Sequence, residues 1–139
     1  MKTTSLLLVL LLSASLSFAQ NKMAVVGTWK LISGKFTQSG DTATYYYDDK
    51  TSDAIKIVTP THFAVFSKNV SDDSLQHAGA GPIQVDDKNY IEEIKYGTDK
   101  DVVGKTAKFT YRIEGDKWYI KGGIENLMTF EETWQRLNK

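Results

Sequence analysis

The chain has 139 residues, equal numbers of acidic and basic side chains (17 Asp and Glu, 17 Lys and Arg), and no cysteine. Balanced charge gives no electrostatic reason to bind nucleic acid or an anionic membrane. The lack of cysteine excludes disulfides, thiol nucleophiles and lipid attachment through a thiol. A chain of this length forms one domain that buries roughly two-thirds of its unfolded surface, so it can fold without such bonds.

Residues 1–19 have the three parts of a signal peptide. Lys2 supplies the positive charge, Leu6–Leu12 is an apolar run, and Ser17-Phe18-Ala19 matches a small-x-small cleavage site. The run is much shorter than the roughly 20 residues of a membrane-spanning helix, which argues against the alternative of an uncleaved anchor. We predict cleavage after Ala19, which leaves residues 20–139, or 139 − 19 = 120 residues, exported to the periplasm or secreted.

The first half of the remaining chain reads as short strands separated by turns. Strands are expected at residues 27–37, 42–47, 54–59 and 62–67, where β-branched and aromatic residues gather. If Trp29 points inward, strand alternation places Leu31 and Ser33 on the same face. The polar stretch Ser67–Gln76 is predicted to be a mobile loop at a barrel mouth.

A hairpin is predicted around Gly115-Asp116. From residue 105 to residue 114 apolar and polar side chains alternate, which puts Ala107, Phe109, Tyr111 and Ile113 on one face. A two-residue turn then places Ile113 opposite Trp118, Tyr111 opposite Ile120, and Glu114 opposite Lys117 as a salt bridge.

A second hairpin is predicted over residues 82–96, with its turn at Asp87-Lys88. This register pairs Ile83 with Glu92 and gives the second strand an inner face of Tyr90, Glu92, Ile94 and Tyr96. Gly79 and Gly81 suggest a bulge or bend just before it. The connections 97–104 and 122–128 each have room for one helical turn.

The last expected strand, residues 130–137, is predicted to pair with the first strand and close the sheet, which removes exposed edges. The fold class that follows is all-β: a single antiparallel meander β-barrel of about 8–10 strands. The alternation shows no second domain and no internal repeat.

Five segments of the chain, in this order, resemble a lipocalin-like (calycin-type) family of small exported proteins of Gram-negative bacteria. They are Gly27–Leu31, Lys56–Phe63, Gly104-Lys105, Ile113–Lys117 and Trp134–Leu137. The resemblance implies a barrel with an internal cavity and no established reaction. It also implies structural roles for Gly27, Trp29 and Arg136, with the Trp plugging one barrel end and the Arg stacked across it.

Glu92 is the leading candidate site residue, because an ionised carboxylate on an inner face is costly unless it is paired. It could fix the orientation of a ligand in an apolar pocket. Two alternatives remain: a structural ion pair, for instance with Arg136, or a register that leaves Glu92 outside. The full predicted ligand-binding set is Glu92, Tyr90, Tyr96, Tyr111, Trp118 and His62.

Nothing in the spacing of residues indicates a catalytic set, a metal site or a cofactor. The two histidines, His62 and His77, lack ligand spacing, and no nucleophile elbow or phosphate loop is present. We therefore expect the barrel to bind a small apolar or amphipathic ligand. The alternatives are a filled-core module that acts through its surface loops, and an acid–base enzyme that uses Glu92 and His62. The oligomeric state is left open.

Overall fold

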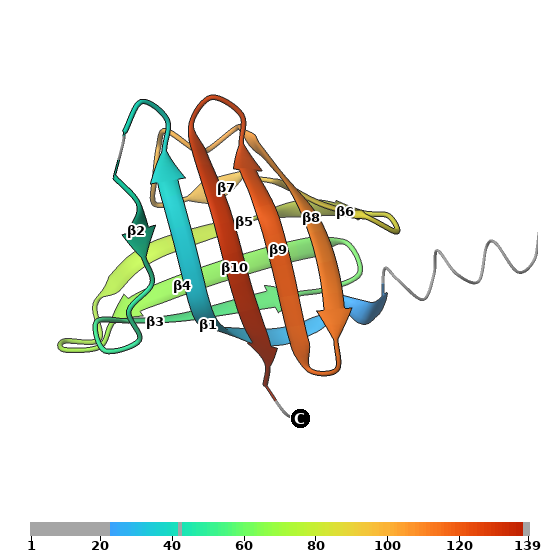
Figure 1. The fold of residues 1–139 in the computed structure, drawn as a ribbon, viewed down its shortest axis with the longest axis horizontal. Coiled ribbons are helices and arrows are strands. Elements are labelled where there is room, and N and C mark those ends of the chain that lie inside the picture. The colour runs from blue at the N-terminus through green and yellow to red at the C-terminus, as the bar shows by residue number, and fades with distance from the viewer. Residues whose placement is uncertain (1–22, 42, 138–139) are drawn as a thin grey trace, which may run out of the picture.

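The computed structural model describes residues 23–41 and 43–137, so the predicted signal peptide and its cleavage site lie outside the described residues. Strands make up most of the described chain (Figure 1). They are β1 (Gly27–Gln38), β2 (Tyr45–Tyr46), β3 (Ser52–Val58), β4 (His62–Asn69), β5 (Leu75–Val85), β6 (Asn89–Glu93), β7 (Tyr96–Gly97), β8 (Thr106–Glu114), β9 (Lys117–Ile124) and β10 (Met128–Arg136).

Eight of these strands form a closed antiparallel barrel, which confirms the predicted fold class. Their order in the sheet is β10-β9-β8-β6-β5-β4-β3-β1, and β1 pairs with β10 to complete the circle. The two-residue strands are additions to this circle, since β2 pairs with β1 and β7 pairs with β5. Closure leaves the long strands without a free edge over most of their length.

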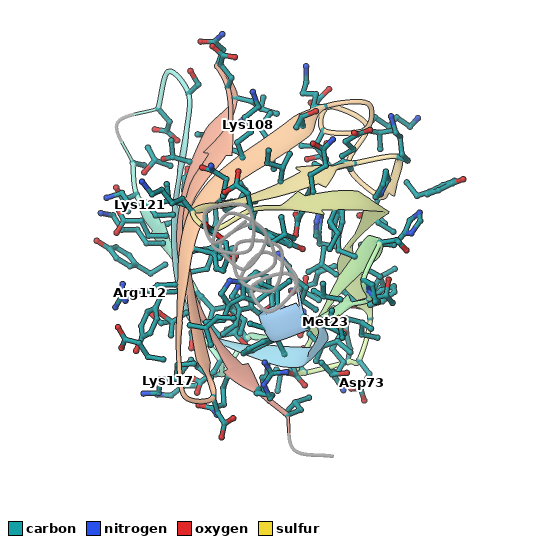
Figure 2. All side chains as sticks on the ribbon, turned by 90° about the vertical axis from the view of Figure 1, so that its right-hand side faces the viewer. Met23, Asp73, Lys108, Arg112, Lys117 and Lys121 are labelled. Atoms are coloured by element: carbon teal, nitrogen blue, oxygen red, sulfur yellow. The ribbon has the colours of Figure 1, made fainter. Side chains whose placement is uncertain are left out.

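Both predicted hairpins have the expected register. Ile113 lies opposite Trp118 across the Gly115-Asp116 turn, and Ile83 lies opposite Glu92. The predicted partner of Glu114 is wrong: its Oε1 lies 2.7 Å from Nε of Arg112, and the salt bridge is with Arg112 rather than with Lys117. Arg112 and Lys117 project from the outer face of the barrel (Figure 2), where such pairs are exposed to solvent.

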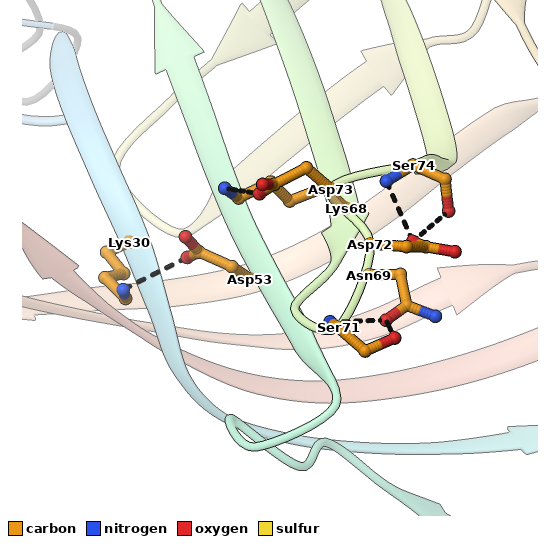
Figure 3. Close-up of polar contacts among 8 residues, drawn as sticks. All are labelled: Lys30, Asp53, Lys68, Asn69, Ser71, Asp72, Asp73 and Ser74. Atoms are coloured by element: carbon orange, nitrogen blue, oxygen red, sulfur yellow. Dashed lines mark hydrogen bonds and ion pairs between the residues drawn. The ribbon is translucent and has the colours of Figure 1, made fainter.

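The polar stretch predicted as a loop over Ser67–Gln76 is shorter than expected, since β4 continues to Asn69 and β5 begins at Leu75. Only residues 70–74 connect the two strands. Asn69 Oδ1 accepts hydrogen bonds from the backbone N and Oγ of Ser71, and Asp72 accepts the equivalent pair from Ser74 (Figure 3). These local bonds make a compact turn out of residues whose polarity alone suggested a longer loop.

The predicted inward face of β1 is wrong beyond Leu31. The pairing of β1 with β10 shifts between Leu31 and Ser33, so the strand contains a β-bulge. As a result Ser33 is exposed and Gly34 is buried, whereas strict alternation would place Ser33 inside. The next predicted strand, over residues 42–47, is likewise reduced to Tyr45–Tyr46.

The predicted inner position of Tyr96 is also wrong, because its side chain is 73% exposed. Strand β6 ends at Glu93, and the chain bends before β7, so alternation does not carry through to residue 96. Gly79 and Gly81, which are predicted to mark a bulge or bend before the hairpin, lie within β5. A Cβ at Gly81 would stand 1.8 Å from the carbonyl oxygen of Glu93, so only glycine fits this close crossing of two backbones.

The connection predicted over residues 122–128 is shorter in the structure, where only residues 125–127 join β9 to β10. Gly122 and Gly123 belong to β9, which ends at Ile124. Residues 100–104 between β7 and β8 form a turn. The last strand, predicted at 130–137, is β10 and pairs with β1 as expected.

One end of the barrel is closed by packed aromatic rings. Trp29 and Trp118 lie 5.2 Å apart between ring centroids, and Tyr90 meets Trp118 edge-on at 4.9 Å. The Arg136 guanidinium stacks on Trp29 at 4.1 Å from the ring centroid. It also donates to the carbonyls of Val26 (2.8 Å) and Ala24 (2.7 Å), while Trp29 Nε1 donates to Val25 at 2.9 Å. In these contacts Trp29 is fully buried at this end of the barrel and Arg136 lies across its ring.

Candidate ligand cavity

The interior of the barrel away from this packed end contains a cavity of about 410 Å³. It is lined by the second half of β1 and the first half of β10, whereas Trp29 and Arg136 stand at the other ends of these two strands. Most of the wall is apolar. Its apolar side chains include Leu31, Ala54, Phe63, Val65, Ile94, Phe109 and Phe130.

A buried ion pair lies in the cavity wall. Lys56 Nζ stands 2.8 Å from Glu92 Oε1, and the two side chains are only 4% and 7% exposed. Lys56 is surrounded by aromatic faces, with its Nζ 5.0–5.9 Å from the ring centroids of Phe63, Tyr90, Phe109, Trp118 and Trp134. Cation–π attraction and the paired carboxylate together replace the water that this ammonium loses on burial.

A second carboxylate, that of Glu132, lines the same cavity. Strand β10 places it between Phe130 and Trp134, and its Oε2 accepts a hydrogen bond of 2.9 Å from Trp134 Nε1. Burial raises the pKa of Glu132, and the nearby Glu92 charge adds to this, while Lys56 and the Trp134 bond act in the opposite direction. The rise shows that the favourable contacts of Glu132 do not offset its desolvation.

His77 and Asp99 also line the cavity, from β5 and from the segment after β7. Burial lowers the pKa of His77 below its ordinary value of 6.5, and the Lys56 charge lowers it further against the opposing effects of Asp99 and Glu92. The imidazole is therefore mostly neutral at pH 7, so it contributes a hydrogen-bonding group rather than a charge.

Of the predicted ligand-binding set, the structure places Glu92 in the cavity wall. Tyr90 and Trp118 are fully buried among the packed aromatic rings at the closed end of the barrel. The hydroxyl of Tyr111 donates to the carbonyl of Asp86 at 2.9 Å. Tyr96 and His62 are exposed, and His62 Nδ1 lies 2.9 Å from the Thr61 hydroxyl.

Sequence patterns did not predict that Lys56, Glu132 and His77 line the cavity. For Lys56 the pattern was misleading, because Ile55 and Ile57 flank it and make the opposite face of β3 look like the inner one. Glu132 could have been found, since an inward Trp134 places Glu132 on the same face by simple alternation. His77 lies in β5, just after the connection that was predicted to extend to Gln76.

Within residues 23–41 and 43–137, no group of three or more His, Asp or Glu side chains is placed to hold a metal ion. Helical segments in the same ranges are too short or too polar to cross a membrane.

Comparison with protein-family models and with curated proteins gives no match. Among solved structures the chain is similar to a redesigned β-barrel, with a TM-score of 0.51 and 15% identity over 85% of this chain and 96% of that one. A de novo designed fluorescence-activating β-barrel matches with a TM-score of 0.45 and 20% identity over 81% of this chain and 93% of that one. At this level of identity the first similarity supports the barrel fold.

Proposed function

We propose that this protein is an exported, lipocalin-like barrel that binds a small amphipathic ligand in its cavity. The observation that carries the proposal is an apolar cavity of about 410 Å³ whose wall also holds a few fixed polar groups. Ligand pockets of proteins span roughly 300–1,000 Å³ and have this mixed lining. A core that served stability alone would gain more from filling such a space with side chains.

Binding would be driven by burial of the apolar part of the ligand, worth roughly 25 cal/mol per Å² before the costs of association. Phe63, Phe109 and Phe130 offer the broadest apolar contact. The polar end of the ligand would lie against Glu92 and Glu132. An acid–base reaction by Glu92 and His62 receives no support, since Glu92 is buried in the wall and His62 is exposed at the start of β4.

The test is binding of a neutral apolar fluorescent probe, N-phenyl-1-naphthylamine, to the wild-type protein and to two variants on adjacent positions of β8. Ala107 lines the cavity and Lys108 is exposed on the outer face. Ala107→Phe should reduce probe binding at least about tenfold by filling the cavity, whereas Lys108→Phe should leave it unchanged. Thermal unfolding of both variants establishes that each remains folded.

Native mass spectrometry followed by organic extraction identifies a ligand that copurifies with the protein. Equal probe binding by the wild type and a folded Ala107→Phe variant would contradict the proposal. It would favour the alternative in which the barrel acts through its outer surface or loops.

A further inference from the structure

The ionisable side chains of the cavity wall leave an excess of negative charge that is available to a ligand. Its acidic side chains are Glu92, Asp99 and Glu132, and its basic ones are Lys35, Lys56 and His77. The Lys56 charge is matched by Glu92 at 2.8 Å. The Lys35 side chain is almost half exposed, and its Nζ lies 3.9 Å from Oε1 of Glu131.

His77 does not supply the missing positive charge, because burial lowers its pKa. The Glu132 carboxylate therefore has one hydrogen-bond donor, the neutral indole N–H of Trp134, and it shares the single Lys56 charge with Glu92. A carboxylate has room for about four hydrogen bonds, so Glu132 retains acceptor capacity toward the cavity.

We infer that the cavity selects amphipathic ligands with a primary ammonium head group, which the Glu132 carboxylate accepts while the alkyl part occupies the apolar wall. This inference rests on the proposed function. An ammonium supplies a positive partner for Glu132 and so relieves the cost of ionising this half-buried carboxyl group. An anionic head group would instead meet Glu132 and Asp99, with the nearest ammonium already paired.

The experiment compares three ligands with the same alkyl chain (decylamine, decanol and decanoate) by their displacement of N-phenyl-1-naphthylamine at pH 7. We expect decylamine to bind at least about tenfold more tightly than decanoate, because only the ammonium can donate charge-assisted hydrogen bonds to the Glu132 carboxylate. Each ligand is used below its micellar concentration.

Two adjacent substitutions on β10 test the role of Glu132. Glu132 faces the cavity, whereas Glu131 is exposed and pairs with Lys121 at 3.1 Å. Glu132→Gln should weaken decylamine binding about tenfold and change decanol binding by less than about twofold. Glu131→Gln should change decanol binding by less than about twofold and decylamine binding by far less than tenfold, because water screens Lys35, which is almost half exposed and lies 3.9 Å from Glu131. Glu92→Gln provides an independent test, since it leaves Lys56 without its carboxylate and should increase the affinity for decanoate.

The inference is overturned if decanoate binds the wild-type protein as tightly as decylamine, or if folded Glu132→Gln retains full affinity for the amine. Either result leaves the proposed function in place as long as decanol still displaces the probe. If neither the probe nor any of the three ligands binds, the proposed function fails along with the inference.

Discussion

At the scale of single residues, the Lys56–Glu92 pair is a charged contact inside an aromatic and apolar core. Removing one member of such a pair leaves a buried charge without its partner, which typically costs about 3–5 kcal/mol. We therefore expect Lys56→Met and Glu92→Gln each to lower the free energy of unfolding by about this amount. Together they should cost less than the sum of the two. Urea denaturation of the two single variants and the double variant measures the coupling.

Lys121→Met is the matched control for this cycle. Lys121 pairs with Glu131 at 3.1 Å, but both side chains are largely exposed. Its loss should cost less than about 1 kcal/mol, because water screens an exposed pair. Additive effects of Lys56→Met and Glu92→Gln on the free energy of unfolding would show that the two charges do not stabilise each other. That result would contradict a buried ion pair in the cavity wall.

Glu132 gives a prediction about pH. Its pKa in the folded protein is raised above the ordinary value of 4.5, so the folded state keeps this proton to a higher pH than the unfolded chain does. Stability from this group is therefore lost as the pH rises from below 4.5 through the raised pKa. Glu132→Gln removes the titration and keeps an acceptor for Trp134.

The free energy of unfolding of Glu132→Gln, relative to wild type, should therefore increase across this pH range and be constant above it. Chemical denaturation at a series of pH values gives the difference. A difference that does not vary with pH would show that Glu132 titrates normally.

At the scale of elements, the end of β10 is joined to the segment before β1 through Arg136. Its guanidinium stacks on Trp29 and donates to the carbonyls of Val26 and Ala24. Lysine keeps the charge but lacks the planar fork that makes both bonds while stacking. Arg136→Lys should therefore lower the free energy of unfolding by about 2 kcal/mol and speed hydrogen exchange at the Val26 amide.

Arg112→Lys is the comparison for this variant. Arg112 also stacks on an aromatic ring, that of Tyr119 at 3.9 Å, but it does so on the exposed outer face of the barrel. Its replacement should change the free energy of unfolding by less than about 0.5 kcal/mol. Equal effects of the two substitutions would mean that Arg136 does not fasten the barrel end.

At the scale of the whole molecule, the N-terminal segment completes the closed end of the barrel. Val25 is fully buried there, and its carbonyl accepts the Trp29 indole N–H. Cleavage after Ala19 would leave this segment intact. We predict that the protein isolated from the exported fraction begins at Gln20, which intact-mass measurement tests. A mass that includes residues 1–19 would contradict the signal-peptide prediction.

Local patterns in the sequence determined the all-β meander, the hairpin registers at Gly115-Asp116 and Asp87-Lys88, and the pairing of the first strand with the last. Turn chemistry and alternation act over a few residues, so the sequence encodes them directly. They fail where the chain departs from regular pairing, as at the bulge after Leu31 and the break before Tyr96.

The partner of the Glu92 carboxylate is set by the three-dimensional arrangement of the strands. Its partner Lys56 is 36 residues away, on a strand whose apolar residues occur on both faces. Alternation places Glu92 on the inner face, but the choice between Lys56 and Arg136 depends on how the strands are staggered around the closed barrel. The same stagger sets which inward side chains stack as a plug at one end and which leave a cavity at the other.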